Sequence, residues 1–158
     1  MSTRVLIDRD EPELEGFVLM AAFNPDAPIP AGARAMPHVR RWLDGWSAPE
    51  TGVCWEENDR LVGAAWARRV EPVLVKSPLG QPIPEVLIAV DPERRGQGIG
   101  RTLMEELVAV AEEACEPGLC LTVGEQNAVA VRLYERVGFV AIGDTRTPLI
   151  TMVLELED

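Results

Sequence analysis

The segment from residue 86 to residue 101 constrains the fold of this chain more than any other. An apolar run at 86–90 ends at Asp91, and three alternating glycines then precede a long helical pattern. A strand, a glycine loop and a helix in this order aim several main-chain N–H groups at one point beyond the helix N-terminus, which makes an anion site. In a chain of formal net charge −11, nearby positive charge favours a phosphate ligand. That charge comes from Arg94, Arg95 and Arg101.

The glycine spacing excludes the two commonest nucleotide loops. A mononucleotide P-loop needs Gly, four residues and then Gly-Lys-Ser/Thr, but counting back from Gly100 places Arg95 at the first glycine and Arg101 at the lysine. A dinucleotide fingerprint, G-x-G-x-x-G, places Arg101 where its third glycine should stand. Taken alone, the loop is also typical of an ordinary strand-to-helix turn.

Two motifs together resemble the GNAT superfamily of acyl-CoA-dependent N-acyltransferases. Arg95-x-x-Gly98-x-Gly100 fits that family's Q/R-x-x-G-x-G/A loop, which wraps the pyrophosphate of coenzyme A. Residues 127–139 fit its second motif, N-x-x-A-x-x-L-Y-x-x-x-G-F, with every fixed position filled. The resemblance covers roughly residues 51–154. The fixed positions of the second motif are Asn127, Ala130, Leu133, Tyr134, Gly138 and Phe139.

The resemblance implies an α/β (α+β) fold in which a mixed, mainly antiparallel sheet has helices on both faces. The periodicities agree with the element order that it implies. Strands are expected at 3–8, 53–57, 61–70, 85–90, 119–123, 139–143 and 148–156. Helices are expected around Leu14, Phe17, Val18 and Ala21, around Val39, Trp42, Leu43 and Trp46, after the glycine loop, and between a cap at Asn127 and a C-terminal glycine at Gly138.

Composition bounds the class of protein. A chain of 158 residues with 47% apolar residues fits one domain, 1–158, with a substantial core. It has no apolar run near the ~20 residues of a membrane span and no leader pattern, so we expect a cytoplasmic protein without a membrane partner. The acidic balance argues against nucleic acid. With one histidine and three scattered cysteines, Cys54, Cys115 and Cys120, we expect no metal site, and we expect the thiols to be small core residues.

The resemblance also implies where acetyl-CoA binds. Main-chain N–H groups of the loop would hold the pyrophosphate, and the pantetheine arm would lie along the strand before the loop. The Arg101 side chain adds a phosphate contact or is solvated. Asn127 reaches the pantetheine amides or serves as a helix cap. The loop residues are Arg95, Gly96, Gln97, Gly98, Ile99 and Gly100, and the strand residues are Ile88, Ala89 and Val90.

Acid–base chemistry is assigned to two side chains. The acceptor ammonium must lose a proton before it attacks the thioester, and the departing thiolate gains one. Tyr134, the only tyrosine in the chain, fills the family's general-acid position, although a helix tyrosine that packs on the sheet is the structural alternative. Glu85 is the first choice for the base and Glu125 the second, because Thr122 and Gly124 stand where many relatives carry a carboxylate on the fifth strand.

We therefore expect an acetyltransferase that moves an acetyl group from acetyl-CoA to a primary amine by direct attack in a ternary complex. The acceptor is a small molecule or a peptide, and the resemblance leaves a homodimer open. The alternative is a non-catalytic acyl-CoA-binding or sensing module, against which Tyr134 and the carboxylates count. Tryptophans in the first half would form the acceptor wall or the core, namely Trp42, Trp46, Trp55 and Trp66.

Overall fold

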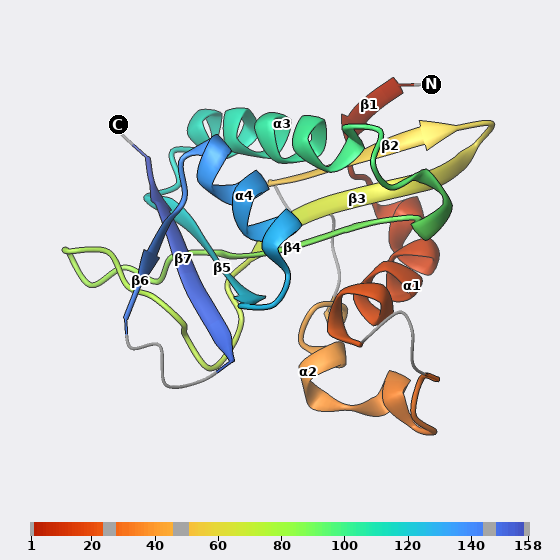
Figure 1. Ribbon diagram of the computed structural model, residues 1–158, viewed down its shortest axis with the longest axis horizontal. Coiled ribbons are helices and arrows are strands. Elements are labelled where there is room, and N and C mark those ends of the chain that lie inside the picture. Colours follow the sequence, from red (N-terminus) through yellow and green to blue (C-terminus); the bar gives the residue numbers. More distant parts are fainter. Residues whose placement is uncertain (1, 24–27, 46–50, 144–147, 157–158) are drawn as a thin grey trace.

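One seven-stranded sheet organises the chain, in the order β1-β2-β3-β4-β5-β7-β6 (Figure 1). The computed structural model describes residues 2–23, 28–45, 51–143 and 148–156. Neighbouring strands are antiparallel except β4 and β5, so the expected fold class is confirmed. The strands are β1 (Ser2–Val5), β2 (Gly52–Glu57), β3 (Arg60–Arg68), β4 (Glu85–Val90), β5 (Gly118–Gly124), β6 (Val140–Ile142) and β7 (Leu149–Glu155).

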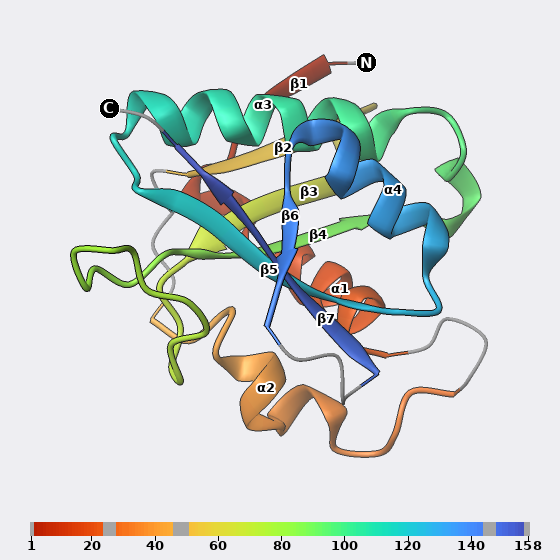
Figure 2. The same cartoon turned by 60° about the vertical axis from the view of Figure 1, so that its left-hand side comes forward.

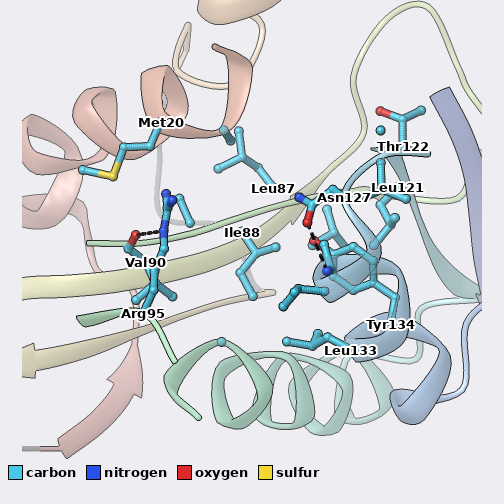
Figure 3. Close-up of a pocket in the computed structure, with 18 of the residues that line it drawn as sticks. Met20, Leu87, Ile88, Val90, Arg95, Leu121, Thr122, Asn127, Leu133 and Tyr134 are labelled. Carbon is cyan, nitrogen blue, oxygen red and sulfur yellow. Dashed lines mark hydrogen bonds between the residues drawn. The ribbon is translucent and has the colours of Figure 1, made fainter. Parts of the chain in front are cut away.

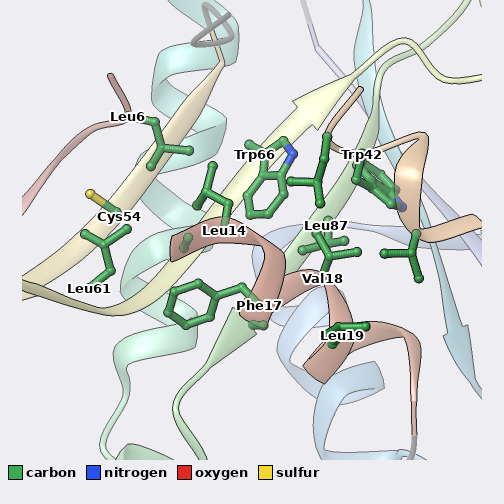
Figure 4. Packing of buried hydrophobic residues seen from close by; sticks show 14 of the residues in the cluster. Leu6, Leu14, Phe17, Val18, Leu19, Trp42, Cys54, Leu61, Trp66 and Leu87 are labelled. Atoms are coloured by element: carbon green, nitrogen blue, oxygen red, sulfur yellow. The ribbon is translucent and has the colours of Figure 1, made fainter. Parts of the chain in front are cut away.

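Helices cover both faces of the sheet (Figures 1 and 2). On one face, α1 (Glu11–Ala22) and α2 (Pro37–Arg40) enclose a core in which Trp42 packs edge-on against Trp66 at 6.4 Å between ring centroids (Figure 4). On the other face, α3 (Ile99–Glu113) and α4 (Ala128–Val137) cover a second core. Side chains of β4 alternate between the two, with Leu87 and Ala89 in the first core and Val86 in the second.

The two long helices of the second face follow their local sequence. In α3 the buried residues recur every three or four positions, and most of the glutamates face outward. Asn127 caps α4, because its Oδ1 accepts a hydrogen bond from the Ala130 N–H at 3.2 Å. Gly138 ends α4 at φ 121°, which side chains other than glycine rarely adopt. The predicted cap and stop of this helix are confirmed.

Two elements near the N-terminus are shorter than expected. The first strand ends at Val5 instead of residue 8, because the Asp10 carboxylate accepts the Ile7 N–H at 2.8 Å and turns the chain. The helix expected around Trp42 ends at Arg40, because Arg68 donates hydrogen bonds to main-chain carbonyls of the next turn, at Arg41 and Asp44. Trp46, which was expected in this helix, lies outside the described residues.

The junction between β4 and β5 opens the sheet. Six residue pairs join β3 to β4 over the whole of β4, whereas β5 pairs with β4 at Glu85 and Cys120 only. Beyond this pair the two parallel strands diverge toward their carboxyl ends. The diverging segment of β4 therefore has one edge without a strand partner.

We predict that Gly118→Ala destabilises the fold. Gly118 begins β5, and an added Cβ would lie 2.6 Å from the Leu154 carbonyl oxygen of β7. Such overpacking costs about 1–3 kcal/mol, and each kcal/mol lowers Tm by roughly 2–4 °C in a chain of this size. Thermal unfolding of Gly124→Ala is the matched control, because that glycine lies at the other end of β5 with nothing within 4 Å of its Cβ position. Equal melting temperatures for the two variants would contradict the register of β5 and β7.

Candidate active site

A cleft of about 1110 Å³ runs along the opening between β4 and β5 (Figure 3). Its lining comes from both faces of the sheet, since Met20 and Trp42 belong to the α1–α2 side and Leu133 and Tyr134 belong to α4. The cleft therefore passes through the plane of the sheet. The residues predicted for the site that line it are Glu85, Ile88, Ala89, Val90, Arg95, Gly96, Gly98, Ile99, Gly100, Arg101, Asn127 and Tyr134.

The glycine loop presents free main-chain donors at one end of the cleft. Gly96 and Gly98 have φ of 78° and 81°, the left-handed region that favours glycine. Gly98 is the N-cap of α3 and has no side chain to cap the helix. The N–H groups of residues 95–101 make no hydrogen bond within the described part of the chain. Free donors at a helix N-terminus favour an anionic ligand, which is the kind of ligand that the spacing predicts.

Arginine side chains surround this loop. Arg94 pairs with Glu57, and its guanidinium lowers the pKa of that carboxyl below its usual value. The exposed Arg95 donates from Nε to the Val90 carbonyl oxygen at 3.3 Å (Figure 3). Arg101 pairs with Glu105 at 2.7 Å on the outer surface. Gln97, whose Oε1 accepts from Arg94, is the one predicted loop residue that does not line the cleft.

The charge of the cleft is opposite to that of the whole chain. Among the described residues that line it, Glu85 is the single carboxylate. A positive cleft in a chain of net charge −11 draws a negatively charged ligand to this place and not to the rest of the surface. The cleft contains six arginines, Arg41, Arg94, Arg95, Arg101, Arg132 and Arg136.

The middle of the cleft offers the open edge of β4 and the side chain of Asn127. Ile88, Ala89 and Val90 lie where β4 has left β5. The Asn127 Oδ1 is used in the helix cap, and its amide nitrogen makes no hydrogen bond within the described residues. The two roles considered for Asn127 are therefore compatible, because they use different atoms of the amide.

Tyr134 lies between α4 and the sheet. Its ring packs against Phe139 with 6.0 Å between centroids, and burial raises the pKa of Tyr134 to about 12. The hydroxyl is therefore protonated throughout the neutral range and can donate a proton or a hydrogen bond.

Glu85 lies at the closed end of the opening, where β4 and β5 still pair. Its side chain is 7% exposed, and Arg41 contacts it with 3.2 Å between Nη2 and Oε2. Burial raises the pKa of Glu85 above its usual value, and the Arg41 charge opposes that rise. Glu125, the second choice for the base, does not line the cleft.

Cys120 is the β5 partner of Glu85, and its thiol is buried. Sγ lies 3.5 Å from the carbonyl oxygens of Ile83 and Pro84, and burial raises the pKa of Cys120 to about 12. A neutral thiol is a poor nucleophile, so Cys120 is the core residue that was expected, as is the buried Cys54, whereas Cys115 is exposed at the end of α3 and the expectation was wrong for it. In the described ranges no three side chains of the metal-binding types come together.

The three described tryptophans are divided between the two cores. Trp42 lines the cleft, while Trp66 is wholly buried behind it. Trp55 packs in the core of the opposite face, and its Nε1 donates to Glu57 at 3.3 Å. Trp46 lies outside the described residues. One of the three described tryptophans therefore contributes to the wall that was expected of them.

Sequence reasoning missed the side chains at the α1–α2 end of the cleft. Phe23 and His38 line it, with 5.7 Å between their rings, and so do Met20 and Arg41. They come from the end of α1, from α2 and from the turn after it, none of which carries a motif, and only the tertiary fold brings them to the cleft. The part of the chain that the structure describes contains no helix long and apolar enough to cross a membrane.

The sequence is similar to known acetyltransferases over part of its length. It is 44% identical over 54 residues to the peptidyl-lysine N-acetyltransferase YjaB of Salmonella typhimurium, a match that covers 34% of each chain. It is 34% identical over 101 residues to a mycothiol acetyltransferase of Thermobispora bispora, covering 63% of this chain and 33% of that protein. The matched segment thus spans about a third of the length of these relatives.

The fold is similar to that of solved acetyltransferases. The structure of yncA, a putative acetyltransferase from Salmonella typhimurium with its cofactor acetyl-CoA, matches with a TM-score of 0.67 at 23% identity and covers 100% of this chain and 95% of that one. The family model for the acetyltransferase (GNAT) family matches residues 17–139, which include both the glycine loop and the motif that ends at Phe139. The chain therefore belongs to the acetyltransferase (GNAT) family.

Proposed function

We propose that residues 1–158 form one catalytic domain that transfers an acetyl group from acetyl-CoA to a primary amine. The observation that carries this proposal is the cleft through the sheet, because it joins the glycine loop on one face to Glu85 on the other. A donor and an acceptor that enter from opposite faces would meet at the opening. Holding the two substrates together removes the entropy cost of a bimolecular encounter.

Acetyl-CoA would bind from the loop toward the closed end of the opening. The free N–H groups of residues 95–101 would receive the pyrophosphate. The pantetheine arm, itself an amide chain, would pair with the open edge of β4 at Ile88 to Val90. Since Arg95 donates to the Val90 carbonyl, we expect acetyl-CoA to displace that exposed contact. The Asn127 amide nitrogen is free to bind a pantetheine carbonyl.

The reaction would then use two side chains and one main-chain donor. Glu85 takes the proton of the acceptor ammonium, directly or through a water. The amine nitrogen attacks the thioester carbonyl carbon, and a main-chain N–H on the open edge of β4, closer to Glu85 than Val90 is, stabilises the negative oxygen. The carbon–sulfur bond breaks, and the Tyr134 hydroxyl donates its proton to the departing thiolate. The second proton of the attacking nitrogen then returns to the Tyr134 phenolate, directly or through water, which leaves a neutral amide and free coenzyme A. Burial makes Glu85 a stronger base and keeps Tyr134 protonated before the reaction, although it also makes the Tyr134 hydroxyl a weaker acid.

We predict that Tyr134→Phe lowers kcat by about a hundredfold or more, with acetyl-CoA affinity within about twofold of the wild type. The ring remains, so the contact with Phe139 and the fold persist. Thiol release measures kcat, and calorimetry measures affinity. An unchanged kcat would remove Tyr134 from the acid role.

We predict that Glu85→Gln slows the reaction at neutral pH and that the rate recovers at high pH, where the acceptor amine deprotonates without help. In the wild type, activity should fall as the pH drops through the pKa of Glu85, which lies above the usual value because the side chain is buried. The matched control is Glu125→Gln, an exposed carboxylate outside the cleft, which should leave the pH–rate profile unchanged. A loss in Glu85→Gln that is equal at every pH would indicate a structural role instead.

A further inference from the structure

The acceptor end of the cleft contains one cation and one anion in contact. Five of the six arginines that line the cleft belong to the glycine loop, the start of α3 or α4, whereas Arg41 follows α2 on the other face. It lies beside Glu85, with 3.2 Å between Nη2 and Oε2. Val90 is five positions after Glu85 along β4, so this pair lies about 17 Å from the end of the strand that precedes the loop. Arg41 is therefore remote from the phosphate site.

Arg41 has N–H donors that make no hydrogen bond within the described residues. A guanidinium carries five N–H groups in a planar fork. Arg41 contacts one carboxylate among the described residues, that of Glu85, and it does so through one nitrogen. The Arg41 Nε is buried without a hydrogen-bond partner in the described residues. The side chain is 29% exposed and lines the cleft, so it can turn further donors toward a ligand. A second anion at this position would complete its hydrogen bonding.

The surroundings hold Arg41 at this position. Arg68 of β3 binds the main-chain carbonyls of Arg41 and Asp44, at 3.2 Å and 2.8 Å. The guanidinium lies 5.5 Å from the centroid of the Trp42 ring, a cation–π distance. Trp42 and Leu87, which lies two positions along β4 from Glu85, line the cleft and give apolar surface beside the pair. Low polarity strengthens charge recognition at such a place.

We propose that the acceptor is a small amino acid with an apolar side chain, whose carboxylate binds Arg41 while its amine faces Glu85. This proposal rests on the acetyl transfer proposed above. A free α-amino acid carries its ammonium and its carboxylate on one carbon. This arrangement matches the contact between Glu85, which would face the ammonium, and Arg41, which would bind the carboxylate. A polyamine would place a second positive charge against Arg41. The side chain of a peptidyl lysine has no carboxylate close to its amine.

The test compares each amino acid with its carboxamide, which has the same side chain but no carboxylate. Because the carboxamide also lowers the pKa of the amine, the acid-to-amide ratio is compared between variants at one pH. Thiol release from acetyl-CoA is measured with free amino acids such as methionine and phenylalanine, and with their carboxamides. For the wild type we expect kcat/KM to be higher for the acids by about ten- to hundredfold, the usual effect of a charge-assisted hydrogen bond. Arg41→Gln should remove this preference by raising KM for the acids, and Arg41→Lys should restore part of it.

If Arg41→Gln displaced the Glu85 side chain, the rates for acids and amides would fall alike. The ratio of kcat/KM for an acid to kcat/KM for its amide therefore measures carboxylate binding alone. The matched control is Arg40→Gln, because Arg40 is the adjacent arginine, is 33% exposed, and pairs with Glu15 and Asp44 outside the cleft. It should keep the wild-type ratio. Equal kcat/KM for acids and amides in the wild type, or an unchanged ratio in Arg41→Gln, overturns this proposal alone. Binding of acetyl-CoA with no turnover of any amine contradicts the acetyl transfer itself.

Discussion

The end of strand pairing between β4 and β5 is the constraint on which the rest of the site depends. Two parallel strands that stayed paired would close the sheet and satisfy each other's peptide groups. Here they pair at Glu85 and Cys120 and then separate, so one edge of β4 lacks a strand partner within the sheet. A ligand made of amides can occupy that edge as a strand would. The same opening gives the cleft its passage from one face of the sheet to the other.

Charge is arranged along this passage in a definite order. The loop end has free N–H groups, a helix N-terminus and arginines, all of which favour phosphate. The middle is apolar strand edge. The far end has the buried Glu85 and the partly exposed Arg41; burial raises the pKa of the carboxyl, and the guanidinium limits the rise. A chain with an overall negative charge thus concentrates positive charge at the cleft, where it steers an anionic donor.

Features encoded by neighbouring residues could be predicted from the sequence. The glycine loop, the Asn127 cap and the Gly138 stop each depend on a few adjacent positions, and all appear where the motifs indicate. The pairing of Arg41 with Glu85 could not be predicted, since 44 positions separate the two residues and no motif joins them. The early end of α2 also depends on a distant residue, Arg68. The tryptophans show the same limit, because Trp55 and Trp66 belong to different faces of the sheet.

The proposed site predicts that the glycine loop and the open edge of β4 bind acetyl-CoA together. A titration of the ¹⁵N-labelled protein with acetyl-CoA, followed through its amide resonances, tests this. We expect saturable shifts of one bound state that are largest at residues 98–101, with a second group at residues 88–90. Saturable binding whose shifts lie elsewhere, or no shift at either segment, would contradict it.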